Sequence, residues 1–107
     1  MLYRIDTFTV PEEARREFAA RSVRIIALLR TQPGFVRDHW FEKISGAGAV
    51  NVVTLVAWQD VQSIEAAGRT VRALNACDGF DATAFAREHG IVESKAVYEE
   101  RGQPEVA

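Results

Sequence analysis

The chain has few of the residues from which proteins build disulfides and metal sites. Cys77 is the single cysteine among 107 residues, so an internal disulfide is impossible, and a lone cysteine fits a reducing compartment. His39 and His89 are the two histidines, and no carboxylates are spaced to complete a metal site with them. We therefore expect a protein without a bound metal.

Membrane, targeting and nucleic-acid signals are missing as well. No apolar run approaches the roughly 20 residues that a bilayer span requires. The first residues have a strand-like pattern instead of a basic segment followed by an apolar one. The net charge is only −2 and basic residues alternate with acidic ones, so neither nucleic acid nor an anionic membrane is an expected partner. The expectation is a cytoplasmic protein.

Two common catalytic signatures are also absent. Gly46 and Gly48 form a bare Gly-x-Gly without the rest of a dinucleotide-binding fingerprint. There is no Gly-x-Ser-x-Gly motif, and Cys77 has no adjacent histidine to activate it. The sequence gives no support for phosphate binding or for nucleophilic catalysis.

The residues that are present fit one small α+β domain. The composition, 48% apolar and 26% charged, is ordinary for a soluble globular protein. Alternating apolar residues predict strands, and apolar residues three or four apart predict helices. The expected strands cover residues 2–10, 35–44, 49–58 and 91–100, and the expected helices cover residues 12–31, 61–74 and 81–90.

The order of these elements predicts the fold. A β-α-β-β-α-β order is the split βαβ arrangement of ferredoxin-like sandwiches, in which a four-stranded antiparallel sheet carries its helices on one face. Pro33 and Gly34 end the first helix, while Asp60 and Asp81 are candidate N-caps for the later ones. Residues 1–100 form the expected domain, and residues 101–107 a frayed tail.

The third expected strand has apolar residues on both faces. Between Val50 and Trp58 only Asn51 and Thr54 are polar, whereas a half-exposed antiparallel strand alternates. Helices on one face of the sheet leave the other face bare, and the same sheet of a second copy is the simplest cover for it. The pattern therefore predicts a homodimer.

Two short motifs resemble a known family. Residues 28–35, Leu-Leu-Arg-Thr-Gln-Pro-Gly-Phe, resemble the Leu-Arg-x-x-Pro-Gly-Phe passage of antibiotic-biosynthesis-monooxygenase domains, and residues 56–60, Val-Ala-Trp-Gln-Asp, resemble the end of their third strand. The resemblance covers roughly residues 2–100. It implies a dimeric α+β barrel, and either cofactor-free oxygenation of aromatic polyketides or haem degradation.

The residues that differ from the family's patterns limit this resemblance. The oxygenases tend to carry an Asn four residues before the strand-three Trp, where this chain has Thr54. Asn51 is no substitute, because an odd separation from Trp58 puts it on the opposite face. The haem-degrading branch needs a histidine iron ligand where this chain has Gly68. Haem degradation is therefore not expected.

Three residues are candidates for catalysis in a cofactor-free oxygenase, which must deprotonate its substrate and stabilise the resulting anion. His39 lies on an expected strand and histidine titrates near neutral pH, which suits a base. Trp58 offers a flat wall with an N–H donor, and Thr54 shares its face. Each also has an ordinary structural explanation: an edge-strand histidine, a core tryptophan and a β-branched strand residue.

Substrate-binding candidates come from the second strand and the first helix. Phe18, Ile25 and Leu29 recur on one helical stripe, which is expected to close a cavity over the sheet, and Trp40 is a second large aromatic residue. Hairpin register decides whether Trp40 or His39 shares the face of Thr54, and the turn sequence leaves both registers open.

The sequence therefore favours a homodimeric, monooxygenase-like protein that binds a small aromatic or apolar molecule. Whether it also oxidises that molecule, without metal or flavin, is left open. Two alternatives remain: a non-catalytic dimer that binds or senses a small molecule, and a related dimeric-barrel isomerase or cyclase. The Thr54 replacement weighs toward these alternatives, and the fold alone decides nothing here because unrelated activities share it.

Overall fold

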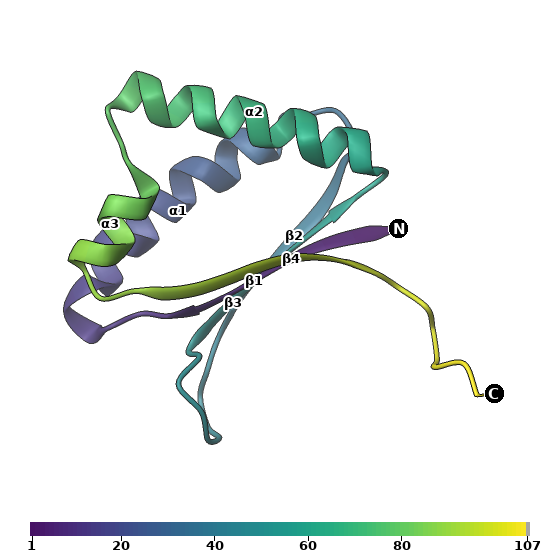
Figure 1. Cartoon of the computed structure of the whole chain (residues 1–107), viewed down its shortest axis with the longest axis horizontal. Coiled ribbons are helices and arrows are strands. Elements are labelled where there is room, and N and C mark those ends of the chain that lie inside the picture. Colours follow the sequence, from purple (N-terminus) through teal and green to yellow (C-terminus); the bar gives the residue numbers. More distant parts are fainter. Residues whose placement is uncertain (107) are drawn as a thin grey trace.

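The computed structural model describes residues 1–106, which form a four-stranded antiparallel sheet with three helices on one side (Figure 1). The strands stand in the order β2-β3-β1-β4. Their bounds are Leu2–Thr9 for β1, Phe35–Glu42 for β2, Val52–Trp58 for β3 and Val92–Glu99 for β4. The predicted ferredoxin-like α+β fold is confirmed.

The second and third helices begin at the capping residues that the sequence predicts. A short 3-10 turn, Glu12–Ala14, leads into α1 (Arg15–Leu29), and α2 and α3 cover Val61–Asp78 and Ala82–Glu88. The carboxylates of Asp60 and Asp81 accept hydrogen bonds from the third backbone N–H of α2 and α3, so both predicted N-caps are confirmed. Among residues 1–106, every helix is too short or too polar to span a membrane.

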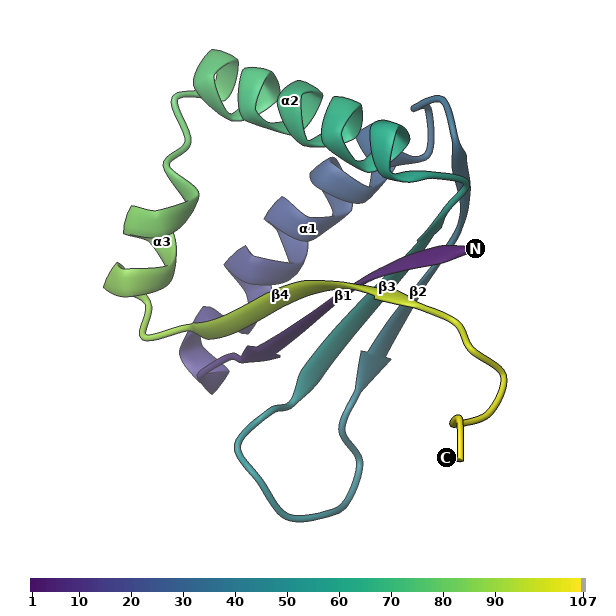
Figure 2. The ribbon, with the colours of Figure 1, turned by 45° about the vertical axis from the view of Figure 1, so that its right-hand side comes forward.

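Two predicted boundaries differ from the structure. Helix α2 runs four residues past its predicted end at residue 74 and stops at Gly79, whose positive φ of 63° ends it. The β2–β3 hairpin is shorter than predicted and its loop longer. At the end of this loop the Asn51 side chain bonds both the backbone N–H and the backbone carbonyl of Val10. That bonding ties the end of the loop to the residue that follows β1, and the loop projects beyond the sheet (Figure 2).

The core lies between the sheet and the helices, in two clusters. One gathers around Phe8 and Phe18, whose ring centroids are 4.9 Å apart with a steep interplanar angle. The other gathers around Trp58, which packs edge-on against Phe35 with centroids 5.9 Å apart. No helix covers the opposite face of the sheet within residues 1–106 (Figure 1).

Candidate functional site

A cavity of about 410 Å³ lies between the helices and the sheet. This volume is within the range of about 300–1,000 Å³ that is usual for small-molecule sites. Its floor is formed by the four strands, and its roof by α1, α2 and α3. Figure 2 shows α1, α2 and α3 on the same side of the sheet.

Most of the cavity wall is apolar and aromatic. Trp58, only 2% exposed, and Trp40 line it from the sheet, and the ring centroids of Trp40 and Phe18 are 5.8 Å apart. The predicted stripe of α1 lines it from the other side with Phe18, Ile25 and Leu29. The sequence-based candidates for binding thus surround one space, with Thr54 among them.

The observed register settles which side of β2 meets this space. Trp40 pairs with Thr54, and His39 pairs with Leu55. Because successive strand residues alternate, Trp40 and Thr54 point toward the helices and His39 toward the uncovered face. The imidazole of His39 stacks on the ring of Phe41, two residues further on that face, with centroids 5.8 Å apart.

The role of His39 as the base of this cavity stays a prediction, and the register of β2 does not favour it. This residue is part of the cavity lining along β2, but strand alternation and the stacking on Phe41 direct its ring to the opposite side of the sheet. His89 is also accounted for structurally. It ends α3, where Nδ1 lies 2.9 Å from the Phe85 carbonyl oxygen and Nε2 lies 2.9 Å from a carboxylate oxygen of Glu17.

The cavity wall formed by β1 and β4 carries charge. Arg4 and Asp6 on β1 form an ion pair, with Nε 2.7 Å from Oδ1, and Glu93 and Lys95 lie beside them on β4. Burial raises the pKa of Asp6 above its usual value, although Arg4 and Lys95 act to lower it. Loss of hydration therefore outweighs the attraction of two cations at this carboxyl group.

Asp38, a second carboxylate in the lining, behaves in the opposite way. Two hydrogen bonds from the guanidinium of Arg30, 2.7 and 2.9 Å long, hold the pKa of Asp38 below its usual value. Asp38 is therefore a fixed anion. The pKa values of Asp6 and Asp38, two of the three carboxyl groups that line the cavity, are thus shifted in opposite directions, an arrangement found at sites that perform acid–base chemistry.

A cluster of charged residues fastens the end of α2 to α1. Asp78 accepts hydrogen bonds from Arg21 and Arg24 at 2.6–2.7 Å, and Arg21 also donates to Asn75. The guanidinium of Arg21 lies over the Phe80 ring, 4.1 Å from its centroid. The Arg21 Nε is buried without a hydrogen-bond partner, at the edge of the cavity. These contacts close one end of the cavity.

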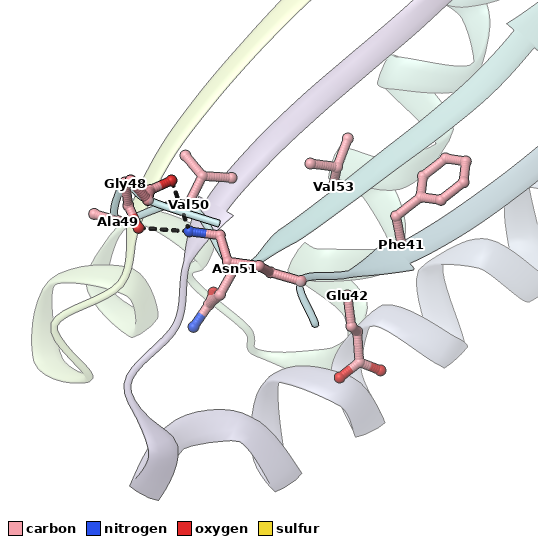
Figure 3. Close-up of a pocket in the computed structure, with 9 residues that line it drawn as sticks. Phe41, Glu42, Gly48, Ala49, Val50, Asn51 and Val53 are labelled. Carbon is pink, nitrogen blue, oxygen red and sulfur yellow. Dashed lines mark hydrogen bonds between the residues drawn. The ribbon is translucent and has the colours of Figure 1, made fainter. Parts of the chain in front are cut away.

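A second hollow lies under the β2–β3 loop, on the other side of the sheet (Figure 3). Its volume is about 510 Å³, and Phe41 and Val53 form its floor. The Lys43 ammonium donates to the Ala47 and Gly48 carbonyl oxygens, and the Asn51 amide is engaged with Val10. Its polar groups are already paired within the chain, so we take the helix–sheet cavity as the candidate site.

Sequence reasoning missed the charged wall of this cavity. Arg4 and Asp6 alternate with Tyr3 and Ile5, so they share a strand face with the core residue Phe8. A charged residue predicted on the core-facing side of a strand is a usable signal, and it was present in the first eight residues. Within the described residues 1–106, no group of three or more His, Cys, Asp or Glu side chains could hold a metal ion.

Comparison with known proteins agrees with the fold. Residues 1–79 match the model of the antibiotic biosynthesis monooxygenase family. No curated protein sequence matches the chain significantly.

Several solved structures superpose on nearly the whole chain. SnoaB, a cofactor-independent oxygenase from Streptomyces nogalater, has a TM-score of 0.71 and 21% identity over 94% of this chain and 92% of its own. MhuD, a haem-degrader from Mycobacterium tuberculosis, has a TM-score of 0.68 and 18% identity over 94% of this chain and 95% of its own. An ethyl tert-butyl ether D family protein from Bacillus halodurans has a TM-score of 0.67 and 20% identity over 94% and 99%. At these identities the likeness establishes the fold alone.

Proposed function

This chain belongs to the antibiotic biosynthesis monooxygenase family, and from that premise we propose that it binds a flat aromatic molecule in the helix–sheet cavity and oxidises it with molecular oxygen, without metal or flavin. The observation that carries the proposal is the cavity itself, whose apolar walls include both tryptophans of the chain. SnoaB, which shares the fold, is a cofactor-independent oxygenase.

The shape of the wall favours a planar ligand. Trp40 and Trp58 present large faces, and Phe18 lies opposite on α1. Aromatic side chains bind aromatic ligands by stacking or edge-to-face contact, and they exclude water from the space between. A polyketide-like aromatic of two or three fused rings suits a cavity of about 410 Å³.

Cofactor-free oxygenation requires a cavity from which water is excluded, with polar groups gathered at one point of its wall. An electron-rich anion of the substrate can reduce oxygen directly, so the protein must assist deprotonation and stabilise the anion. The Thr54 hydroxyl, on the cavity face beside Trp40, is the proposed donor to a substrate oxygen atom. Asn is usual in the resembling oxygenases, and a hydroxyl can replace its N–H as a donor.

A homodimer is part of the proposal. The sheet face without helices is rich in apolar residues: Ile5, Phe41, Val53, Leu55, Ala96 and Tyr98. Phe41 and Tyr98 are about half exposed in the single chain. A second copy placed on this face would bury them and back the floor of the cavity, which stiffens the strands that carry Trp40 and Thr54.

Haem is the substrate that the fold relative MhuD degrades, and the cavity of this chain lacks a residue suited to it. Gly68 lines the cavity from α2 at the position where the resembling haem-degrading enzymes carry their iron-binding histidine. His89 is engaged at the end of α3. We therefore propose an organic aromatic substrate in place of haem.

Two measurements test the proposed function. Dithranol, a dihydroxyanthrone, should quench tryptophan fluorescence saturably, because both indoles of the chain line the cavity. Oxygen consumption with dithranol should exceed the protein-free rate, and it should persist after treatment with a chelator and removal of flavin. One atom of the oxygen ends in the new quinone carbonyl and the other in water.

The alternatives predict other outcomes. Saturable binding without oxygen uptake, across several anthrones and naphthols, would favour a binding or sensing protein. Conversion of a ligand without oxygen consumption would favour the isomerase or cyclase reading. No saturable binding of any flat aromatic would overturn the proposal.

A further inference from the structure

One row of side chains crosses the whole sheet on its cavity side. Trp40 on β2 pairs with Thr54 on β3, Thr54 pairs with Asp6 on β1, and Asp6 pairs with Lys95 on β4. All four residues line the cavity. Side chains of directly opposed residues have Cβ atoms about 4.5–5.5 Å apart, so neighbours in this row are close enough to act on one bound molecule.

From this row we propose that Asp6 is the general base of the reaction, and that it removes a proton from an acidic C–H or O–H group of an aromatic substrate lying between Trp40 and Lys95. This inference rests on the proposed function, whose chemistry requires a base. His39, the candidate expected from the sequence, has its ring on the other side of the sheet.

The proton-transfer step is balanced within the site. The bond between the substrate's carbon or oxygen atom and its proton breaks, and a new O–H bond forms on the Asp6 carboxylate. The electron pair stays on the substrate and spreads over its aromatic rings. The anion can be stabilised by the Lys95 ammonium, on the far side of Asp6, and by the hydroxyl of Thr54 on the near side.

The surroundings of Asp6 suit a base. Its side chain is 17% exposed and lies among residues that exclude much of the water, and this burial raises the pKa of its carboxyl group. A carboxylate with raised proton affinity removes a proton more readily than one in water. The ion pair with Arg4 fixes the orientation of the carboxylate, because Arg4 Nε donates to Oδ1 and leaves Oδ2 for the substrate.

Other charged groups border the same space and will influence the titration of Asp6. They are Arg4 on β1, Glu93 and Lys95 on β4, Asp38 on β2, Arg21 on α1 and Arg72 on α2. Asp38 is bound to Arg30 and Arg21 is bound to Asp78. Glu93, whose contact with the Lys95 ammonium is longer at 3.7 Å, is therefore the carboxylate that competes with Asp6 for the role of base.

The assignment is tested by deuterium exchange without oxygen. In deuterated buffer under anaerobic conditions, the wild-type protein should accelerate exchange at the acidic methylene group of dithranol above the protein-free rate. Asp6→Asn, which keeps the size and loses the base, should reduce this acceleration by about 100-fold or more. The affinity of this variant for dithranol, measured by fluorescence, should change little. The acceleration of exchange by the wild-type protein should rise with pH, and in Asp6→Asn this rise should be lost.

Controls separate the outcomes. Asp81→Asn makes the same substitution outside the cavity and keeps an acceptor at the start of α3, so it should exchange like the wild type. If Asp6→Asn accelerates deuterium exchange as much as the wild type, or if Glu93→Gln loses the acceleration instead, the role of Asp6 is overturned. The proposed function would remain intact in both cases. Absence of both binding and oxygen uptake in the wild type would overturn the proposed function, and the base with it.

Discussion

Trp40 and Thr54 pair directly across β2 and β3, which puts the indole and the hydroxyl side by side on the cavity face. A register shifted by one residue would have exchanged Trp40 for His39 and turned an aromatic wall into a polar one. The ring of Phe18 on α1, 5.8 Å from Trp40, fits only the observed register. This single pairing decides which residues a ligand would meet.

Both indoles should report ligand binding independently. Trp40 and Trp58 both line the cavity, so the single-tryptophan variants Trp58→Phe and Trp40→Phe should each be quenched by dithranol with the same dissociation constant. Phenylalanine can keep the edge contact of residue 58 with Phe35. Fluorescence titration of the two variants measures this. If one remaining indole does not respond, the ligand occupies only the other end, and a non-saturating response would indicate adsorption.

The uncovered sheet face should hold two chains together. Light scattering at micromolar concentration should give about twice the chain mass of 11.9 kDa. Phe41→Glu places a charge on that face and should shift the protein toward monomers, because a buried unpaired charge is costly at an interface. Val23→Glu makes a comparable change on the exposed side of α1 and should stay dimeric. A monomeric wild type would contradict the sheet-to-sheet pairing.

The Asp6 carboxylate should lower stability at neutral pH. Its pKa in the folded chain is raised above the usual 3.8, so the folded state favours the protonated form. The stability linked to this group is complete at low pH and is lost as pH rises through the raised pKa. Asp6→Asn should therefore have a Tm at or above that of the wild type at pH 7, with the difference closing toward pH 3. A clearly lower Tm at pH 7 would mean that the Arg4 ion pair dominates.

Asp78 should show the opposite dependence on pH. Hydrogen bonds from Arg24 and Arg21 hold the pKa of Asp78 well below the usual 3.8. The stabilisation that this carboxylate provides is therefore complete above pH 3.8, and it is lost as pH falls through the lowered pKa. Asp78→Asn should melt earlier than the wild type at pH 7, and the difference should shrink in acid and in high salt. Thermal melts at several pH values measure this, with Asp81→Asn as the matched control. An equal Tm at pH 7 would show that the cluster contributes nothing measurable.

Haem should not be degraded by this protein. With haem and a reductant, the Soret band should decay no faster than in a protein-free control, because Gly68 offers no iron ligand from the cavity wall. Gly68→His provides a contrast: the helical glycine has room for a Cβ, with only the mobile end of Arg72 near, at 3.4 Å. This variant should gain a haem-bound absorption spectrum. Ring cleavage by the wild type would contradict the proposed substrate class.

Much of the fold could be read from short-range patterns. Alternation in the strands, the apolar stripe through Phe18, Ile25 and Leu29, and the caps at Asp60 and Asp81 all act over a few residues, and each predicted its element. The end of α2 was placed four residues too early, because Asn75 and Asp78 resemble loop residues in sequence. In the structure they are held in the helix by Arg21 and Arg24 of α1, a contact between distant segments.

The sequence by itself determined the order of the elements and the apolar side of each one. Only the tertiary structure decided which residues meet in the cavity, because strand register depends on long-range pairing and a slip of one residue reverses every side chain. Asp6 has a signal in the sequence, because it is a charged residue on the strand face of Phe8, but that signal does not say which groups surround its carboxylate. Asp6 becomes a candidate base once β3 and β4 align Thr54 and Lys95 on either side of it, and the helices remove the water that would otherwise hydrate its carboxylate.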